Sequence, residues 1–430
     1  MITVSEFKKI LAENSEISAY EIVGTVNESR QLFYVGRELE TNRSVKTEEL
    51  TASVYVDFDE FRGSSTVVIT SADDAESAAE KLKAAVIKAK QAKNPYYPLA
   101  EKTENLKAVS ASAQDLTQLA KETADAVFKG EEGAESQLNA TEVFADHHII
   151  HFLNSNDVEH EYDQYSIFFE SVPSYDGEKE DVELYFHKSS GLNQTEKYTD
   201  DIRSAMVNVK YRYEAVKPEE VKIPENLLIA VKEEMLLNIM GNFAQELSYN
   251  RQFYKMSHFK IDDTISEVPF DMILKGVEEG VYGSSPVDGN GIVLKETKVI
   301  DQGKASAYWG NQRFGYYMKE KEITGSYPIA VLENYPVISE EDKNKPVLYI
   351  MNFSAPQLDT TSGYFGGEVR LALLKEGDKI TPLTGFSVSG NIYEAINTVR
   401  FSEETDVVCS PRGISIKGPK YLYFDQLKLH

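Results

Sequence analysis

The residues best suited to chemistry lie in one short stretch, LNIMGNFAQE at 237–246. Asn238, Asn242 and Gln245 fall at i, i+4 and i+7, so a helix would carry all three on one face. Gly241 stands among them, although glycine costs about 1 kcal/mol relative to alanine inside a helix. The polar face fits a solvated or inter-domain surface. Gly241 is most simply a close-packing position.

Three histidines lie close together in the stretch ADHHIIHF, as His147, His148 and His151. In a strand, His147 and His151 would share a face but stand about 13 Å apart, which is too far for one metal ion. We therefore expect a solvated strand face here and no metal site.

Cys409 is the only cysteine, which excludes an intramolecular disulfide and suits a reducing cytoplasm. A thiol nucleophile needs a neighbouring base or a cationic environment. The nearest candidate in the sequence is Arg412. We expect a buried or half-buried structural cysteine and no thiol catalysis.

The charge of the chain argues against nucleic acid as a direct partner. Its 430 residues include 45 basic and 70 acidic side chains, a formal net charge of −25, whereas phosphate backbones reward clustered lysine and arginine. The N-terminal sequence lacks the pattern of a secretory signal, and no apolar run reaches the roughly 18–20 residues of a membrane span. These features predict a cytoplasmic protein that does not enter membranes.

The first half predicts the same order of elements twice, as a helix, several antiparallel strands and a helix. The expected helices lie near Val4–Ala12, from a cap at Ser71 to just before Asn94, from a cap at Ser112 to Gly130, and near Thr199–Ala215. The strand-like runs are AYEIVGTV, QLFYVG, TASVYVDF and STVVIT, then TEVFAD, HIIHFL, YSIFFESV and VELYFHK. We infer a structural duplication over about residues 1–93 and 110–216.

A second domain follows the proline-containing segment 214–226. It should begin with a long helix from about Pro224 to Leu247 and continue mainly as strands. Hairpin turns are expected at 301–303 and 376–378, and Asn391 should cap a short helix. The predicted fold is α+β, with a duplicated α/β domain at 1–218 and a β-rich domain with one long helix at 219–430.

Several C-terminal stretches together resemble the TldD/PmbA family, which is related to metallopeptidases and long labelled as modulators of DNA gyrase. The matching stretches are 285–309, 363–399 and 409–429, and SVSGNIYEAI within the second is the most specific of them. The layout of the N-terminal half also fits, so the resemblance covers essentially the whole chain.

In the catalytic branch of that family, the corresponding helix carries His-Glu-x-x-x-His, and a C-terminal cysteine completes the zinc ligands. Aligning on Gly241 places Leu237, Asn238 and Asn242 at the His, Glu and His positions, with Cys409 at the third ligand. None of the first three can hold zinc or act as the base. The resemblance therefore implies the PmbA-like branch, with no metal in this chain and zinc only in a TldD-like partner.

The resemblance also allows the polar face of that helix to be the wall of a relict peptide groove, which the glycine-rich segment TTSGYFGGE at 360–368 would extend. Glycines allow a backbone or ligand to approach closely, so we name Gly363, Tyr364, Phe365 and Gly366 as groove candidates together with Gly241 and Gln245. A plain mobile loop explains the segment equally well.

The resemblance implies a PmbA-like subunit of a metallopeptidase system that acts on small or unfolded peptides. It would form a heterodimer with a TldD-like homologue that keeps the zinc motif. The alternative is a stand-alone, non-catalytic homodimer that binds peptides. A hydrolase that uses Cys409 on its own ranks last, and any catalytic residues of this chain are unknown from the sequence.

Overall fold

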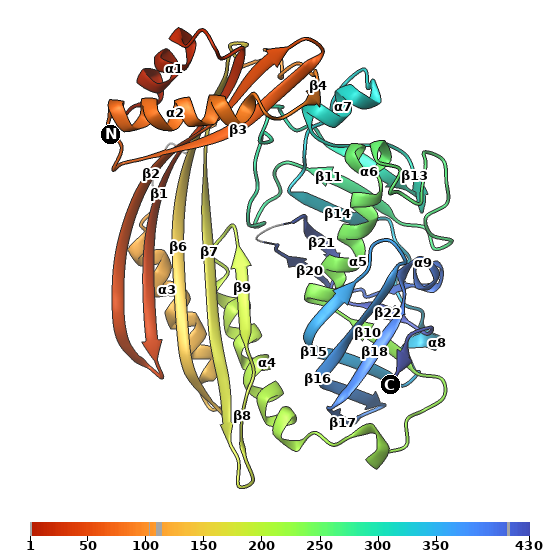
Figure 1. Ribbon diagram of the computed structural model, residues 1–430. Helices are drawn as coiled ribbons and strands as arrows, with labels where there is room; N and C mark the ends of the chain where they lie inside the picture. The colour runs from red at the N-terminus through yellow and green to blue at the C-terminus, as the bar shows by residue number, and fades with distance from the viewer. Residues whose placement is uncertain (1, 103, 109–113, 411–412) are drawn as a thin grey trace.

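The computed structural model describes residues 2–102, 104–108, 114–410 and 413–430, and shows two parts lying side by side (Figure 1). The N-terminal part is one large curved sheet with helices packed on it. The C-terminal part consists of two smaller sheets with a central helix between them. Mixed helices and strands in several sheets confirm the predicted α+β class.

The N-terminal sheet has nine strands in the described residues, in the order β4-β3-β2-β1-β6-β7-β5, with β8 and β9 also paired to β7. The elements are α1 (Val4–Glu13), β1 (Ala19–Val35), β2 (Glu38–Phe58), β3 (Phe61–Thr70), α2 (Ala75–Ala89), β4 (Asn94–Pro95), β5 (Leu106–Ala108), α3 (Leu116–Glu131), β6 (Gln137–Asn154), β7 (Glu159–Asp176), β8 (Asp181–Glu183), β9 (Phe186–Ser190) and α4 (Thr195–Glu214).

The strands of this sheet are longer than the sequence predicts. AYEIVGTV and QLFYVG, apart from its final Gly36, are both parts of β1, and TEVFAD and HIIHFL are both parts of β6. The polar segment inside β1 stays extended because the strand is paired on both sides, with β2 and with β6. Glu28 also forms an ion pair at 2.8 Å with Lys46, its partner on β2. Polar residues alone do not end a strand when its ladder continues.

The helices of this part pack in two groups. α1 and α2 cover β1, β2 and β3, while α3 and α4 pack against β6 and β7. The N-cap of α2 is Asp74 and not Ser71, because its carboxylate accepts from the Ser77 backbone N–H. Asp115 caps α3 in the same way. Ser112, the predicted cap, lies outside the described residues.

The predicted order of helix, antiparallel strands and helix occurs twice, as α1, β1–β3 and α2 and then as α3, β6–β9 and α4. Both sets share one sheet, which is joined where β1 pairs with β6. Descent from a duplication, and the domain limits at 218 and 219, stay predictions.

The C-terminal part contains an eight-stranded sheet in the order β19-β22-β10-β15-β16-β18-β23, with β17 on β16, and a six-stranded sheet in the order β13-β12-β11-β14-β21-β20. Its elements are η1 (Pro218–Glu220), β10 (Leu228–Val231), α5 (Glu233–Glu246), α6 (Tyr249–Phe253), β11 (Asp271–Lys275), β12 (Thr297–Asp301), β13 (Lys304–Ala305), α7 (Gln312–Met318), β14 (Ile329–Glu333), α8 (Glu340–Lys343), β15 (Val347–Leu358), β16 (Tyr364–Glu376), β17 (Lys379–Leu383), β18 (Phe386–Asn391), α9 (Ile392–Ala395), η2 (Ile396–Thr398), β19 (Arg400–Phe401), β20 (Thr405–Val408), β21 (Ser415–Pro419), β22 (Leu422–Phe424) and β23 (Lys428–Leu429).

The long helix of this part is shorter than predicted. It was expected from Pro224 to Leu247, but α5 begins at Glu233 and the preceding Leu-Ile-Ala-Val forms strand β10. All four residues of β10 are buried, and the strand pairs with β15 on one side and β22 on the other. A short, uniformly apolar run cannot be assigned to helix or strand by periodicity, and here the sheet takes it.

One apolar face of α5 fills the space between the two sheets. Met235, Leu236, Ile239, Met240 and Phe243 are almost completely buried in the largest core of the chain. The predicted turns at 301–303 and 376–378 are present, and Asn391 caps α9. Among the described residues, no helix is both long enough and apolar enough to span a membrane.

Candidate functional site

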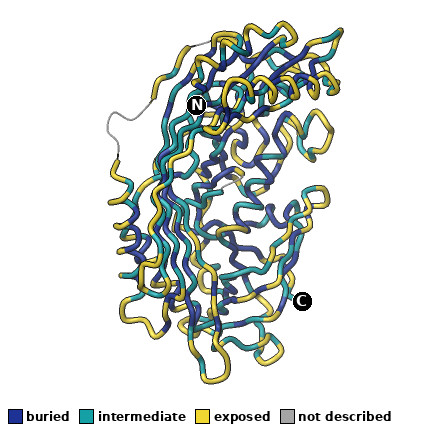
Figure 2. The backbone as a smooth tube through the Cα atoms, turned by 60° about the vertical axis from the view of Figure 1, so that its left-hand side comes forward, coloured by how far each residue is buried: buried dark blue, intermediate teal, exposed yellow. Residues whose placement is uncertain are grey.

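A cavity of about 1190 Å³ lies between the two parts of the molecule. β9 and α4 of the N-terminal part form one wall, and α5, β15 and β20 of the C-terminal part form the other. The walls mix apolar side chains such as Leu237, Ile350 and Phe353 with charged ones. Figure 2 shows the same two halves from the side, with buried segments facing each other between them.

The cavity brings together six of the residues singled out from the sequence. Its lining includes, besides other residues, Leu237, Asn238, Gly241, Asn242, Gln245 and Cys409. The five helix residues face the cavity because the opposite side of α5 is fixed in the core. The degenerate zinc-motif positions and Cys409 therefore line the same cavity. In the sequence, Cys409 follows Glu246, the last residue of α5, by 163 positions.

The glycine-rich residues at the start of β16 do not line this cavity. Gly363, Tyr364, Phe365 and Gly366 are not among the described residues that line the cavity. The Phe365 side chain is fully buried in the core. A Cβ on Gly363 would lie 2.3 Å from Cδ2 of Tyr393, so this glycine allows close packing within the chain. The structure thus separates these four residues from the groove that was predicted to include them.

The polar face of α5 includes a buried side chain that has hydrogen-bond partners. Asn242 is only 4% exposed, and its amide oxygen accepts from Arg251 Nη1 at 3.0 Å. Its amide nitrogen lies 3.3 Å from the Tyr393 hydroxyl. Gly241 is not a close-packing position, because a Cβ there would meet no atom within 4 Å. The glycine instead leaves free space on the cavity side of the helix.

Cys409 is half-buried, as expected for a structural cysteine. Burial raises the pKa of its thiol, although the nearby charge of Lys188 acts in the opposite direction. The thiolate that would attack a substrate or bind a metal is therefore disfavoured at neutral pH. His187 lines the same cavity, but its ring packs with Phe168 and Tyr185. Arg412 lies outside the described residues.

The residues at the zinc-motif positions do not fit a zinc ion. Leu237 offers no donor atom, and Asn238 and Asn242 carry neutral amides where zinc prefers imidazole, thiolate or carboxylate. The Arg251 guanidinium lies against Asn242, and a fixed cation repels a second one. Within the described ranges, no group of three or more His, Cys, Asp or Glu side chains is placed to hold a metal ion.

The three neighbouring histidines lie on β6 and differ from the expected solvated face. His147 is only 9% exposed, its Nε2 lies 2.9 Å from Asp163 Oδ2, and its ring stacks on Tyr165. His151 pairs with Glu159 at 2.8 Å. Partners on the neighbouring strand β7, which the sequence pattern does not reveal, hold both rings.

One end of the cavity carries a cluster of charged groups from three elements. Lys188 of β9 lies 3.5 Å from Asp201 of α4 and 3.6 Å from Asp406 of β20. Lys197 also pairs with Asp406. Burial opposes the charge of Lys188, but the two carboxylates outweigh it and raise the pKa of the ammonium group. This network ties the N-terminal sheet to the edge of the six-stranded sheet.

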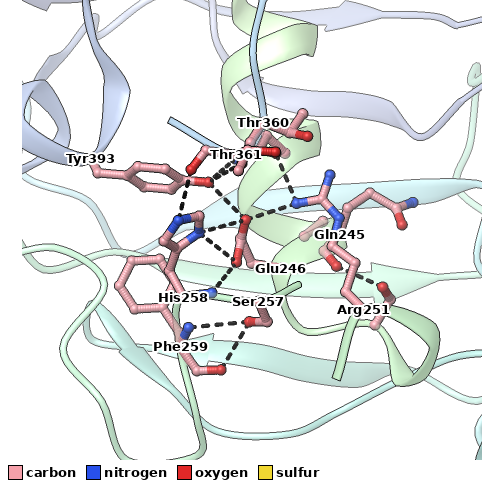
Figure 3. A network of polar contacts seen from close by, with 12 residues as sticks. Gln245, Glu246, Arg251, Ser257, His258, Phe259, Thr360, Thr361 and Tyr393 are labelled. Atoms are coloured by element: carbon pink, nitrogen blue, oxygen red, sulfur yellow. Dashed lines mark hydrogen bonds and ion pairs between the residues drawn. The ribbon is translucent and has the colours of Figure 1, made fainter. Parts of the chain in front are cut away.

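A second polar network surrounds Glu246 at the C-terminal end of α5 (Figure 3). The carboxylate is fully buried, and Oε1 accepts from Arg251 Nη1 and lies near the Tyr393 hydroxyl, both at 2.7 Å. Oε2 accepts from the His258 backbone N–H at 2.7 Å. The network joins α5, α6, the segment after α6 and α9.

Sequence reasoning missed this network. One signal was present, because Asn238, Asn242 and Glu246 repeat every four residues along the same helix. A buried carboxylate also requires charged or hydrogen-bonding partners. Those partners, however, lie up to 147 residues away in the sequence.

The C-terminal half of the chain matches a known protein family. Residues 227–428 match the PmbA/TldA metallopeptidase C-terminal domain. Among curated proteins, no significant match exists. Solved structures with the same fold extend the similarity to the whole chain.

Three of these solved structures illustrate the likeness. TldE from Thermococcus kodakarensis has a TM-score of 0.78 at 14% identity, covering 98% of this chain and 99% of its own. A proposed modulator of DNA gyrase from Bacteroides thetaiotaomicron gives 0.77 at 16% identity, covering 100% and 99%. Another, from Thermotoga maritima, gives 0.73 at 14% identity, covering 100% of both chains. At these identities the likeness establishes the fold.

Proposed function

Because the chain belongs to the TldD/PmbA family, with residues 227–428 as its metallopeptidase-related C-terminal domain, we propose that it is a peptide-binding subunit without zinc in a TldD/PmbA-type peptidase system. Its partner would be a TldD-like homologue that keeps His-Glu-x-x-x-His, and its substrates would be small or unfolded peptides. We place this system in the cytoplasm, where a lone cysteine stays reduced. One observation carries the proposal: the helix with the degenerate zinc motif faces a large cavity bordered by strand edges.

Three strands present an edge at this cavity. β9 pairs with β7 and β20 pairs with β21, and the described residues provide no strand on the other side of either. β15 pairs with β10 only at residues 347–349, so its continuation from 350 to 358 is paired on the β16 side alone. Residues of all three strands line the cavity.

Such edges suit an extended peptide chain. A peptide that adds as a strand gains affinity from hydrogen bonds along its own backbone, and these do not depend on its sequence. Side chains of either character could be accommodated, because the walls mix apolar residues such as Met351 and Phe353 with charged ones.

The size of the space also favours a peptide. At about 1190 Å³ the cavity exceeds the 300–1,000 Å³ that is typical of small-molecule sites. A smaller cavity of about 300 Å³ shares Gln245, Gly413 and Ile414 with it and continues the space past the end of α5. An extended chain could therefore run along the helix.

Hydrolysis by this chain alone lacks the necessary groups. Cleaving an amide requires an activated water or nucleophile together with stabilisation of the oxyanion. The zinc-motif positions provide no metal ligands, and burial keeps Cys409 protonated. The activated water would therefore come from the zinc-bearing homologue.

The test combines binding and activity on the full chain. A fluorescein-labelled, unstructured peptide of about a dozen residues should bind, as measured by anisotropy. Gly241→Phe should weaken binding at least tenfold, because the ring would project into free space on the cavity side of α5. Gly241→Ala at the same position is the matched control and should bind normally.

Mixing experiments address the partner. Together with the His-Glu-x-x-x-His homologue from the same organism, the chain should form a stable complex whose peptidase activity a chelator abolishes. A homodimer that binds peptide but ignores the homologue, seen by light scattering, would favour the stand-alone alternative. Cleavage by the isolated chain that resists chelation would refute the proposal.

A further inference from the structure

We propose that His258 is a positioning residue for the cavity wall: its protonated ring fastens the loop 359–363, so that peptide binding weakens as this ring loses its proton. The inference rests on the proposed function for the peptide, but the attachment of the loop can be tested without any ligand.

The loop 359–363 joins β15 to β16 at the cavity. Leu358 and Thr360 line the cavity, so the open edge of β15 leads directly into this loop. The Asp359 carboxylate accepts from the Thr361 backbone N–H and from the Ser362 hydroxyl, both at 2.8 Å. These bonds give the loop a compact internal shape.

Two sets of bonds attach the loop to the rest of the chain. On one side, the Asn391 amide donates to the Ser362 carbonyl, and the Ile392 backbone N–H donates to the Gly363 carbonyl, both at 2.8 Å. On the other side, the Tyr393 hydroxyl lies 2.8 Å from the Thr360 carbonyl oxygen. His258 Nε2 lies 2.9 Å from the Thr361 carbonyl oxygen (Figure 3).

The surroundings of His258 suit the doubly protonated ring. The Thr361 carbonyl only accepts hydrogen bonds, so Nε2 must carry a proton to bind it. Nδ1 faces both oxygens of the Glu246 carboxylate, at 3.3 and 3.4 Å, and these also only accept. A neutral ring has one proton for two acceptors and leaves a lone pair against one of them. If Nε2 loses its proton, the hydrogen bond to the loop is lost. If Nδ1 loses its proton, a lone pair faces the Glu246 carboxylate.

The Tyr393 hydroxyl cannot replace the missing proton. It has a single proton and two acceptors, the Glu246 carboxylate and the Thr360 carbonyl. When the His258 ring is neutral, the ring and the Tyr393 hydroxyl donate one proton each. These two protons must then serve three acceptor groups, the Glu246 carboxylate, the Thr360 carbonyl and the Thr361 carbonyl.

The charged and titratable neighbours of the ring come from every element around it. The Glu246 carboxylate of α5 faces the ring, and Arg251 of α6 pairs with the same carboxylate at 2.7 Å. The Tyr393 ring of α9 lies 4.4 Å from the His258 ring. On the loop itself, hydrogen bonds from Ser362 and Thr361 hold the pKa of Asp359 low.

A fastened loop should favour binding because a wall that is already ordered pays less entropy when the peptide arrives. The open edge of β15 ends at this loop, so loss of the attachment would loosen that end of the edge. Peptide affinity should therefore fall about fivefold when the ring becomes neutral.

Hydrogen exchange of the amides in 360–364 tests the attachment directly. At about pH 6, His258→Gln should lower their protection about tenfold relative to the unmodified chain, and at about pH 8.5 the difference should be smaller. Comparing both proteins at the same pH removes the intrinsic effect of pH on exchange. His258→Arg, which keeps a permanent charge and several donors, should keep the protection at both pH values.

His151→Gln is the matched control, because it removes another histidine that is paired with a carboxylate on the distant strand β6. It should not change exchange in 360–364. Equal protection in His258→Gln and the unmodified chain at about pH 6 would overturn the proposal.

The labelled peptide gives the functional readout. Its affinity for the unmodified chain should fall between about pH 6 and pH 8.5, while its affinity for His258→Gln should stay constant. A pH dependence that persists in His258→Gln would also overturn the proposal. If the peptide binds at neither pH while the exchange difference is present, the peptide-binding function fails and the attachment of the loop stands.

Discussion

Arg251 Nη1 lies 2.7 Å from Glu246 Oε1, so that a fully buried carboxylate at the end of α5 meets a guanidinium from α6. The same guanidinium nitrogen donates to the Asn242 amide oxygen. The polar end of the helix that lines the cavity is therefore held by one charge pair and not by solvent.

Loss of the Glu246 charge should destabilise the chain. Glu246→Gln removes a charged acceptor from Arg251 and from the His258 backbone N–H, and we expect a loss of about 3 kcal/mol in the free energy of unfolding. Urea denaturation measures it. Glu234→Gln, an exposed change at the other end of the same helix, should stay within about 0.5 kcal/mol. Equal stability of both variants would show that the network does not hold the helix.

Replacement of Gly241 by alanine should stabilise the protein. The Cβ would meet no atom within 4 Å, and alanine is favoured over glycine inside a helix, so we expect a gain of about 0.5–1 kcal/mol. Gly291→Ala is the contrasting change. Its Cβ would lie 2.2 Å from Phe152 at a φ of +79°, and it should lower the melting temperature. A destabilised Gly241→Ala would mean that the glycine has a backbone role.

Alkylation of Cys409 should be slow at neutral pH. Because burial raises the pKa of this thiol, the reactive thiolate forms at higher pH than it does in a free cysteine. The rate with iodoacetamide should lie well below that of free cysteine at about pH 7 and rise as the pH increases towards 10. Cys409→Ser defines the background. A rate at neutral pH equal to that of free cysteine would revive a role for this thiol in catalysis.

Zinc should not bind stoichiometrically. The cavity offers amides and a protonated thiol at the motif positions, with the Arg251 cation beside Asn242. Elemental analysis after incubation with zinc and gel filtration should give well under one ion per chain, and a chelator should leave the melting temperature unchanged. One tightly held ion per chain would contradict this.

Duplex DNA should not bind directly, despite the gyrase-modulator description of two structural relatives. A net charge of −25 repels the phosphate backbone at long range. A mobility-shift assay with random duplex at low salt should show no complex at micromolar protein. Salt-sensitive binding in that range would reveal a local basic surface that outweighs the net charge.

Much of the fold follows from local signals in the sequence. The turn at Asp301-Gln302-Gly303 and the cap at Asn391 are formed by neighbouring residues, so a short window contains all the necessary information. Strand β10 is different. Its four apolar residues run straight into a helical pattern, and only pairing with β15 and β22 decides their conformation.

The candidate site was predictable only in part, for a similar reason. Asn238, Asn242 and Gln245 share a helix face by simple periodicity, and the structure places them on one cavity. The partners of Glu246 come from α6, from the segment after it and from α9, and no local pattern connects them. Gly363 was misplaced because a glycine that packs against Tyr393 looks, in sequence, like one that admits a ligand.

The pairing of β1 with β6 has a consequence for synthesis of the chain. Glu21 pairs with Asn154 and Val35 with Ala140, so one edge of β1 has no neighbour until the ribosome has made more than a hundred further residues. At about 5–20 residues per second, that edge stays open for on the order of 10 seconds. Polar residues such as Asn27, Glu28 and Arg30 lie along the exposed strand during this interval. The charges of Glu28 and Arg30 discourage an open edge from pairing with another nascent chain.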